Sequence, residues 1–174
     1  MIKVFASILT KDVQKLPFLK QGLNGSRLLK GFGWAARGIW HCAREEWHFR
    51  FHLVIAVYVL LFTPRFSLSR AEGAILALTI AGVLVAELFN SAVERAVDRV
   101  STERHPLAGA AKDMAAGAVL LAAIAAIVVA VFLFWKPDIW FTIFADWGEH
   151  IYKPILLALS AVPAVLFVWK WRAN

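Results

Sequence analysis

Hydrophobic residues in this chain are gathered in four long runs, separated by shorter polar segments. In round boundaries, the runs cover residues 49–63, 71–99, 113–135 and 153–169. A helix needs about 20 predominantly apolar residues to cross the roughly 30 Å hydrocarbon core of a bilayer. The pattern therefore predicts four membrane-spanning helices. The first of them, ended by Thr63 and Pro64, is short and needs flanking residues to reach across.

An amphipathic segment precedes the first run, over residues 26–49. Its charged residues and histidines fall on other helix faces than its apolar residues, which are Leu28, Leu29, Phe32, Ala36, Ile39, Trp40, Ala43 and Trp47. Aromatic residues on one side and basic residues on another are typical of a helix that lies in the membrane interface. We interpret residues 1–25 as a basic leader, because the apolar stretch from Val4 to Leu9 is too short for the core of a signal peptide.

The amino-acid composition supports a membrane protein. Of the 174 residues, 60% are hydrophobic and 18% are charged, and there are 8 Trp and 13 Phe. Soluble domains contain about 45–50% apolar and about 25% charged residues, and a small soluble fold cannot bury this much apolar side chain. The composition excludes a soluble enzyme and a disordered chain. The single cysteine, Cys42, excludes a scaffold held by disulfides.

The formal charge is +7, from 19 basic and 12 acidic residues. Because the basic residues flank apolar runs, the surplus indicates attraction to anionic lipid headgroups rather than to nucleic acid. They are dense before the first run and sparse in the loop after it: Lys3, Lys11, Lys15, Lys20, Arg27, Lys30, Arg37, Arg44 and Arg50, against Arg65 and Arg70. The positive-inside rule then predicts that the N-terminus, the loop between the second and third runs, and the C-terminus are cytoplasmic.

The second apolar run becomes polar on one side toward its end. The polar residues there fall within an arc of roughly 100° on one helix face; they are Glu87, Asn90, Ser91, Glu94 and Asp98. Glu87 is still surrounded by apolar chain, and ionisable groups at such membrane depth are costly and usually functional. Asp98 also fits a solvated helix end, as do Arg95 and Arg99.

Two further charged pairs are candidates for the same chemistry. Lys112 and Asp113 open the third run, and Glu45 and Glu46 end the amphipathic segment, although each pair also fits an ordinary interfacial or solvated position. Carboxylates from different segments, together with a lysine, suit Mg²⁺ and a phosphate-bearing substrate. The sequence contains no phosphate-binding loop of the GxxxxGK[ST] type, and its five histidines lack zinc-protease spacing.

Two long motifs resemble a known family. Residues 87–99 read Glu-Leu-Phe-Asn-Ser-Ala-Val-Glu-Arg-Ala-Val-Asp-Arg, and residues 105–120 read His-Pro-Leu-Ala-Gly-Ala-Ala-Lys-Asp-Met-Ala-Ala-Gly-Ala-Val-Leu. They resemble the signature of the small bacterial integral-membrane lipid kinases, which comprise diacylglycerol kinase and undecaprenol kinase. The resemblance covers residues 27–135. It includes upstream residues at the family's spacing, namely Arg27, Gly38, Glu46, Phe49 and Arg50.

The resemblance implies a homotrimer of three-span subunits, with sites shared between neighbours, that phosphorylates a membrane lipid alcohol with Mg-ATP. It implies that Glu87 is the catalytic base. It also implies that Glu46 and Glu94 hold the metal on the ATP phosphates, and that Asn90 and Lys112 position and neutralise those phosphates. The implied nucleotide contacts are Arg27, Glu103, His105 and Asp113, together with Trp34, which stands where the diacylglycerol branch usually has Tyr. The remaining candidates for substrate contact or support are His52, Ser91 and Asp98.

Some positions look more like the undecaprenol branch. His52 replaces an acidic residue of the diacylglycerol branch, and residues 105–108 and 115–120 also favour the undecaprenol kinases. The expected function is phosphorylation of undecaprenol, diacylglycerol or both, in the bacterial cytoplasmic membrane. Two other functions stay open: a non-catalytic membrane assembly protein, and a small ion-coupled transporter that uses Glu87 and Glu94.

The expected fold is all-α and membrane-integral. It comprises a basic leader (1–25), a lipid kinase core (26–135) with an amphipathic surface helix and three spans, and a C-terminal part (136–174) made of an extra loop and a fourth transmembrane helix.

Overall fold

The computed structural model describes residues 25–100 and 105–169, with side chains from Leu29 onward. Its helices are α2 (Gly25–Glu45), α3 (Trp47–Phe62), the 3₁₀ helix η1 (Thr63–Phe66), α4 (Arg70–Val100), α5 (Pro106–Phe134), α6 (Pro137–Glu149) and α7 (Tyr152–Trp169). Within these described ranges there is no β-strand, in agreement with the all-α prediction. The chain divides into two compact units, one up to Trp40 and one from His41 onward.

The part of α2 up to Trp40 is an amphipathic helix. Its large apolar side chains are exposed, namely Leu29, Phe32, Trp34, Ile39 and Trp40. All of them except Trp34 fall on one face of the helix at 100° per residue, and an exposed apolar face with aromatic residues suits a membrane interface. The prediction of an amphipathic surface helix is therefore confirmed as far as the helix itself is concerned.

Four helical segments are long and apolar enough to span a membrane: Trp47–Phe66, Arg70–Val100, Pro106–Phe134 and Tyr152–Trp169. The first combines α3 with η1, which is how the short first run gains length. Most large apolar side chains on these segments are exposed, as they are where lipid rather than protein surrounds a helix. The protein is an all-α integral membrane protein.

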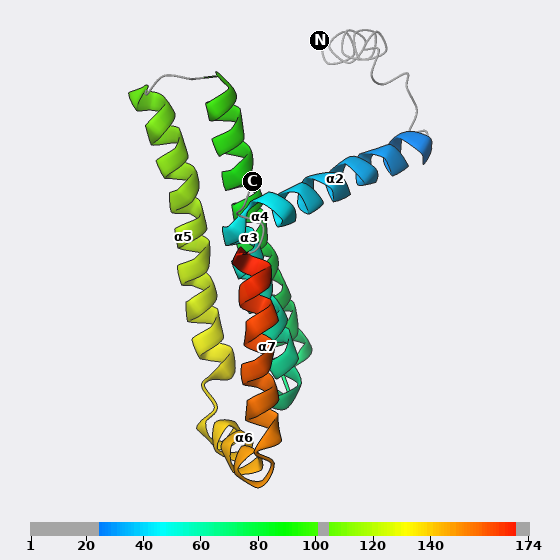
Figure 1. The fold of residues 1–174 in the computed structure, drawn as a ribbon, viewed down its shortest axis with the longest axis vertical. Helices are drawn as coiled ribbons and strands as arrows, with labels where there is room; N and C mark the ends of the chain where they lie inside the picture. The colour runs from blue at the N-terminus through cyan, green and yellow to red at the C-terminus, as the bar shows by residue number, and fades with distance from the viewer. Residues whose placement is uncertain (1–24, 101–104, 170–174) are drawn as a thin grey trace, which may run out of the picture. The chain divides into compact units, whose positions relative to one another are not determined.

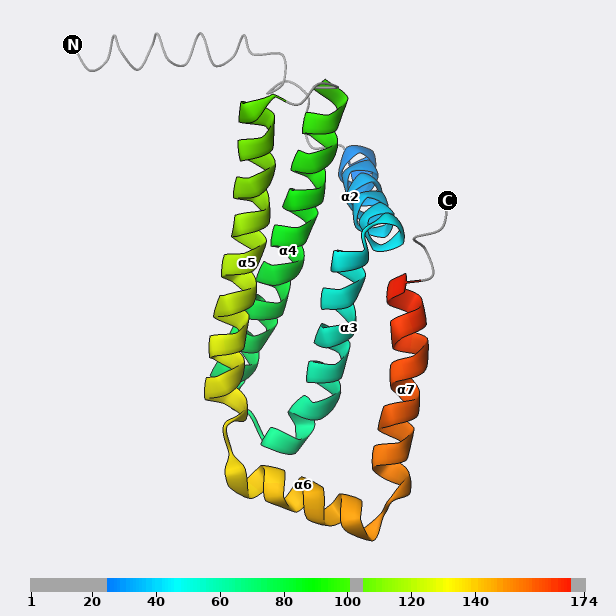
Figure 2. The same cartoon turned by 60° about the vertical axis from the view of Figure 1, so that its left-hand side comes forward.

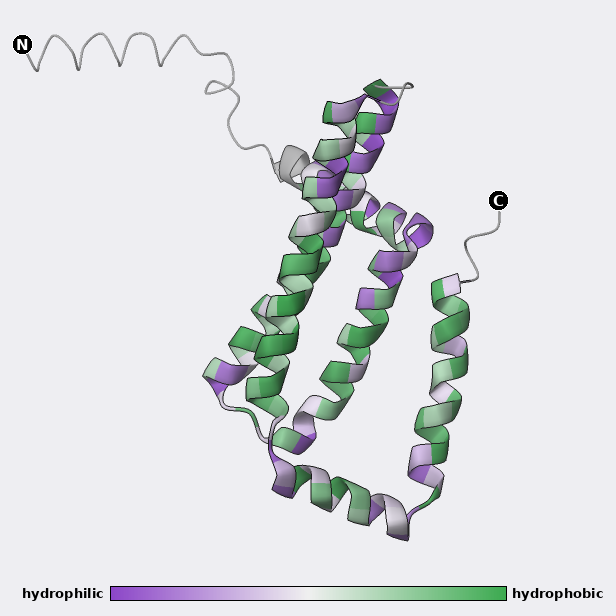
Figure 3. Cartoon of the chain, turned by 90° about the vertical axis from the view of Figure 1, so that its left-hand side faces the viewer, coloured by the Kyte–Doolittle hydropathy of each residue, from purple (hydrophilic) through white to green (hydrophobic). Residues whose placement is uncertain are grey.

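The spanning helices α3, α4, α5 and α7 alternate in direction (Figures 1 and 2). Helix α4 packs along α5, α3 packs against α4 and α7, and α6 contacts α7. This alternation brings the α2–α3 junction, the end of α4, the start of α5 and the end of α7 to one end of the bundle, while α6 lies across the other. Figure 3 shows hydrophobic residues along the middle of the spans and hydrophilic residues where α4 ends and α5 begins.

The helix boundaries follow from local sequence chemistry. Helix α4 begins with a reciprocal capping box, in which the Ser69 amide donates to Glu72 Oε2 at 2.7 Å and the Glu72 amide donates to Ser69 Oγ at 3.2 Å. Helix α5 has Pro106 in its first turn, and the Nδ1 atom of His105 accepts from the Leu107 amide at 3.3 Å. Helix α5 therefore starts well before residue 113, and Asp113 lies inside a helix rather than at its start.

The segment after α5 corrects one expectation. Residues predicted as a loop form the helix α6, with Pro137 and Asp138 in its first turn. Two contacts attach it to neighbouring elements: Trp140 Nε1 donates to the carbonyl of Phe134 at 2.8 Å, and the Trp140 ring meets the ring of Phe66 edge to face. An amphipathic helix with bulky aromatic side chains is stable at a membrane surface, where a bare loop of the same residues would leave them in water.

Candidate active site

Glu87 lies on α4 with its side chain buried, at 3% exposure. Its partner comes from α3: His52 Nε2 lies 3.2 Å from Glu87 Oε1. A carboxylate between apolar spans is costly unless a hydrogen-bonding group is close. The structure thus joins two of the predicted residues, a buried carboxylate and an imidazole, across two helices.

Asn90 and Glu94 form a second polar pair further along α4. Asn90 Nδ2 donates to Glu94 Oε1 at 3.0 Å. The other amide atom, Asn90 Oδ1, is buried and has no hydrogen-bond partner within the part of the chain that the structure describes. A buried acceptor without a partner is costly and calls for an explanation such as a bound ion or a catalytic role. The pair presents an unsatisfied oxygen beside a carboxylate.

Glu46 stands at the break between α2 and α3, where its backbone is extended (φ −98°, ψ 113°). Its Oε1 accepts from Arg95 Nη2 on α4 at 2.8 Å, and the same nitrogen donates to Glu45 Oε2 at 3.0 Å. Arg95 also contacts His41, whose Nδ1 lies 3.1 Å from Glu45 Oε1. Arg95 is partly exposed, as expected at a solvated helix end, but it also connects α4 to the α2–α3 junction.

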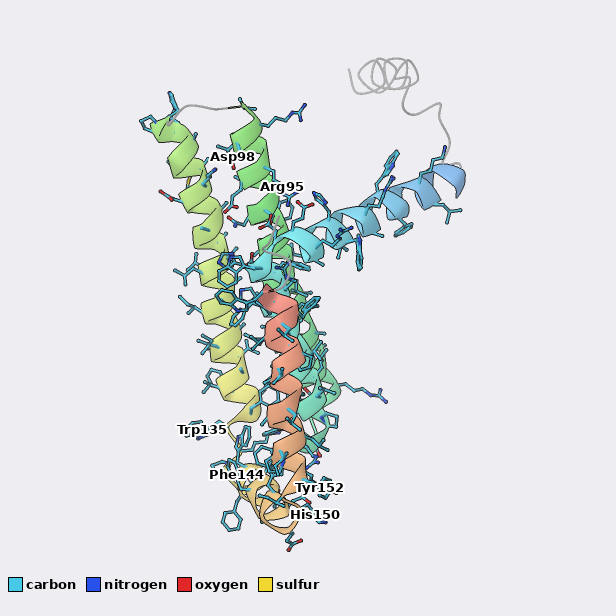
Figure 4. All side chains as sticks on the ribbon, in the orientation of Figure 1. Arg95, Asp98, Trp135, Phe144, His150 and Tyr152 are labelled. Carbon is cyan, nitrogen blue, oxygen red and sulfur yellow. The ribbon has the colours of Figure 1, made fainter. Side chains whose placement is uncertain are left out.

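Lys112 on α5 forms an ion pair with Asp98 on α4. Figure 4 shows Asp98 and Arg95 near the same end of α4, far from Phe144 and His150 at the opposite end of the bundle. Ser91 is buried, with its hydroxyl 3.6 Å from Cys42 Sγ. Burial raises the pKa of the Cys42 thiol, so this cysteine is a neutral packing residue at neutral pH.

The predicted nucleotide contacts are only partly described. Glu103 and the side chain of Arg27 lie outside the described residues, and Trp34 is an exposed residue of α2, 63% accessible. Asp113 is exposed on α5, and His105 caps the start of that helix. These residues keep their roles as predictions.

An apolar cavity of about 420 Å³ opens between α3, α4 and α5. Aliphatic and aromatic side chains dominate its lining, and Thr79 and His52 are its polar members. His52 lines this cavity and also contacts Glu87, so the imidazole lies between the cavity and the buried carboxylate. Pockets of this composition suit a ligand that is mostly apolar, with a polar group at one end.

The side-chain oxygen atoms of Glu46, Asn90 and Glu94 are of the type that binds magnesium together with a phosphate group. Among the described residues no three His, Cys, Asp or Glu side chains stand close enough together to hold a metal ion. Mg²⁺ in phosphate-handling sites uses one or two carboxylates and takes its other ligands from substrate phosphates and water. The carboxylates of Glu46 and Glu94 and the unsatisfied Asn90 Oδ1 are hard oxygen donors of that type.

Sequence reasoning missed the roles of two arginines. Arg95 was set aside as solvated, and Arg50 was treated as part of the basic belt, yet Arg50 is 1% exposed. A weak signal existed for Arg95, which directly follows the candidate ligand Glu94. For Arg50 the family's spacing marks the position, but nothing in the sequence indicates that its side chain bonds to α7.

A buried carboxylate, with an imidazole and an amide group from the same end of the bundle, marks a candidate functional site within four apolar spans. The family model described as prokaryotic diacylglycerol kinase matches residues 33–134. The chain belongs to this family, and it is a lipid kinase of a bacterial membrane that uses a phosphate donor. The match ends where α5 ends, so α6 and α7 lie outside it.

Individual relatives agree with the family match. The chain is 42% identical to the undecaprenol kinase of Bacillus subtilis over 109 residues, which cover 63% of this chain and 89% of that protein. It is 31% identical to the diacylglycerol kinase of Escherichia coli K12 over 111 residues, 64% of this chain and 91% of that one. It is 43% identical to a diacylglycerol kinase of Synechocystis over 103 residues, which cover 59% of each chain.

Proposed function

We propose that this kinase transfers the γ-phosphate of Mg-ATP to the hydroxyl group of a membrane lipid alcohol, with undecaprenol as the preferred acceptor and diacylglycerol as the second candidate. One observation carries the proposal: Glu87 is buried between spans and contacts His52, which lines an apolar cavity. A base in that position meets a hydroxyl group that arrives from the membrane, attached to an apolar chain.

Glu87 acts in this proposal as the general base. Its carboxylate takes the proton of the lipid hydroxyl as the oxygen attacks the γ-phosphorus, the bond to the ADP oxygen breaks, and ADP leaves. His52, at 3.2 Å, holds the Glu87 carboxylate in place. Because the site is shielded from water, the hydroxyl group of the lipid has little competition from water as the acceptor.

The remaining predicted residues handle the phosphates. Phosphoryl transfer depends mainly on positioning and on neutralising charge. Lys112, which pairs with Asp98 in this structure, would turn its ammonium group to the transferred phosphate, and the Asn90 Nδ2 group, which here donates to Glu94, would donate to the phosphate oxygens. Mg²⁺ bound by Glu46 and Glu94 would neutralise the negative charge of the phosphates. The nucleotide contacts we assign are Arg27, Trp34, Glu103, His105 and Asp113.

The preference for undecaprenol rests on the relatives and on the branch-specific residues. The undecaprenol kinase of Bacillus subtilis shares 42% of its aligned residues with this chain, compared with 31% for the diacylglycerol kinase of Escherichia coli K12. His52 and the His-Pro-Leu-Ala motif at residues 105–108 point the same way. The diacylglycerol kinase of Synechocystis, at 43%, keeps diacylglycerol as the second candidate.

We also propose the assembly, the orientation and the domain boundaries. The kinase core covers residues 26–135 and works as a homotrimer whose sites are shared between neighbours, with residues 1–25 as a basic leader and 136–174 as a C-terminal addition. The basic belt before the first span orients the active-site end toward the cytoplasm, where ATP is available. Both termini then lie on the cytoplasmic side.

The test is a lipid panel with the purified full-length protein in mixed micelles. Labelled ATP and Mg²⁺ are supplied with undecaprenol, with diacylglycerol, or with no lipid alcohol. We expect phosphorylated undecaprenol as the main product and a lower rate with diacylglycerol. If neither alcohol nor any other lipid alcohol is phosphorylated, the kinase proposal is wrong; a higher kcat/KM for diacylglycerol contradicts the substrate assignment alone.

A further inference from the structure

One buried side chain connects the appended helix α7 to the candidate active site. Arg50, on α3, is 1% exposed. Its Nε and Nη2 atoms donate to the carbonyl oxygen of Val168 in α7, at 3.2 and 2.9 Å. Its Nη1 atom donates to the carbonyl oxygens of Ala43 and Arg44 in α2, at 3.3 and 2.6 Å. These hydrogen bonds all end on main-chain oxygens in the last turns of two helices.

Both helix ends gain from this arrangement. The last turn of a helix leaves carbonyl oxygens without an intrahelical donor, and a cation there also interacts favourably with the helix dipole. In α2 the last carbonyl groups lack intrahelical donors because the extended backbone of Glu46 separates α2 from α3. In return, the carbonyl groups solvate a guanidinium that would otherwise be buried at a large cost. Arg50 therefore bonds the ends of α2 and α7 to each other.

The break that Arg50 supports determines where the Glu46 carboxylate lies. The Glu46 amide donates to the Cys42 carbonyl at 2.9 Å, and the Arg50 amide donates to the Glu46 carbonyl at 3.2 Å. Arg50 thus holds the junction through its backbone as well as through its side chain. From this junction the Glu46 carboxylate reaches Arg95, the neighbour of Glu94 in the sequence. Any shift of the junction moves the Glu46 oxygen atoms.

Helix α7 is held against α3 on one face. The Tyr58 and Ser160 hydroxyl groups are hydrogen-bonded at 2.8 Å, and Val168 is 5% exposed, whereas Val162 is 57% exposed and faces away. Because α7 lies beyond the family match, which ends at residue 134, one of the three carbonyl acceptors of the buried Arg50 side chain, that of Val168, comes from outside the matched region. The kinase core of this chain relies on an appended helix at a position close to its site.

We propose that α7 is a positioning element for the magnesium nucleotide. Its last turn fixes Arg50, Arg50 fixes the α2–α3 junction, and the junction fixes the Glu46 carboxylate. The inference rests on the proposed function and deepens it. Arg50 is a positioning residue and α7 a positioning element, and neither touches a reacting atom. Their disruption therefore weakens the binding of Mg-ATP and leaves the reaction of the lipid hydroxyl at Glu87 largely intact.

The test compares full-length variants. Arg50→Lys keeps the charge but loses the planar fork that reaches both helix ends. Val168→Trp forces a large side chain into a packed position and displaces the last turn of α7, whereas Val162→Trp makes the same change on the outward face. We expect the KM for Mg-ATP to rise about tenfold in the first two variants with little change in the KM for the lipid, and Val162→Trp to match the wild type.

Two further measurements separate a positioning role from a general loss of stability. Since Arg50→Lys and Val168→Trp interrupt the same connection, the double variant is expected to raise the KM for Mg-ATP no further than the more severe single variant. Hydrogen–deuterium exchange of the amides of residues 44–50 is expected to be faster in both single variants and unchanged in Val162→Trp. Arg50→Lys keeps the test usable if Val168→Trp does not fold.

The outcomes are distinguishable. An unchanged KM for Mg-ATP in Arg50→Lys and Val168→Trp, or a lower kcat with both KM values unchanged, overturns the inference. If the wild-type chain phosphorylates no lipid alcohol, the proposed function fails, and the exchange rates alone then decide whether α7 supports the junction: faster exchange supports it and unchanged exchange overturns it.

Discussion

Replacing Glu87 by Gln removes the proposed base with almost no change in shape. The side chain is 3% exposed and its Oε1 lies 3.2 Å from His52 Nε2. A glutamine amide oxygen still accepts a hydrogen bond from the imidazole, so we expect the variant to fold and to insert like the wild type. The amide group cannot take a proton from a lipid hydroxyl.

The size of the effect follows from burial. A positioned general base contributes about 10²- to 10⁴-fold to a rate, equal to roughly 2.7 to 5.4 kcal/mol of transition-state stabilisation. Because Glu87 is buried among apolar side chains, water cannot replace it as the base. We therefore expect kcat to fall about 10³-fold or more, while the KM for Mg-ATP changes little because Glu87 does not contact the nucleotide in this proposal.

The assay is initial-rate phosphorylation of undecaprenol in mixed micelles, with ATP varied at saturating lipid. The matched control is Glu72→Gln, the same substitution at the opposite end of α4, where Glu72 forms the capping box with Ser69. A glutamine at this position still accepts from the Ser69 amide, so the capping box is kept and kcat is expected to stay at the wild-type value. A Glu87→Gln enzyme that keeps more than about a tenth of wild-type kcat would refute the base assignment.

Three further predictions test other parts of the chain. Lys112→Met should raise the KM for Mg-ATP and lower kcat, with partial recovery in Lys112→Arg, as measured by steady-state kinetics; wild-type constants would contradict its phosphate role. Asp146 accepts from Lys153 at 2.5 Å, which holds its pKa below the ordinary value of 3.8. Its stabilising contribution is therefore present above that value and lost as the pH falls through the lowered pKa. Asp146→Asn should lower the melting temperature at pH 7 but not in strong acid, and an equal loss at both would contradict the ion pair. Cys42 should react with maleimide at least about tenfold faster after unfolding in SDS, because burial raises its pKa in the fold; equal rates would contradict its burial.

The local pattern of apolar and polar residues was sufficient to predict most of the helices and the part of the candidate site that lies on α4. Hydropathy marks each span because a membrane helix must turn mostly apolar side chains toward the lipid. The helical period alone placed Glu87, Asn90 and Glu94 on one side of one helix, and the structure keeps them on α4 with Asn90 bonded to Glu94. These features depend on residues fewer than three turns apart.

Helix α6 was missed although its signal is local. Proline at its first position, Asp138 in its first turn, and apolar residues at helical spacing all mark a helix start and a helical face. A loop is predicted there because the segment lies between two apolar spans and carries acidic residues that offset the nearby lysines. An interfacial helix is polar on one face and apolar on the other. The average hydropathy of such a segment therefore does not distinguish it from a polar loop.

The sequence by itself determined the positions of the four spans, the polar face of the second span and the family, because these depend on local periodicity and on contiguous motifs. Only the tertiary structure decided which faces meet: His52 with Glu87, Glu46 with Arg95, and Arg50 with the carbonyl of Val168, 118 residues away. The physical reason is that a hydrogen bond between helices depends on their packing and rotation, which no single helix encodes. A buried cation whose acceptors are main-chain oxygens is the extreme case, since any residue type can supply a carbonyl.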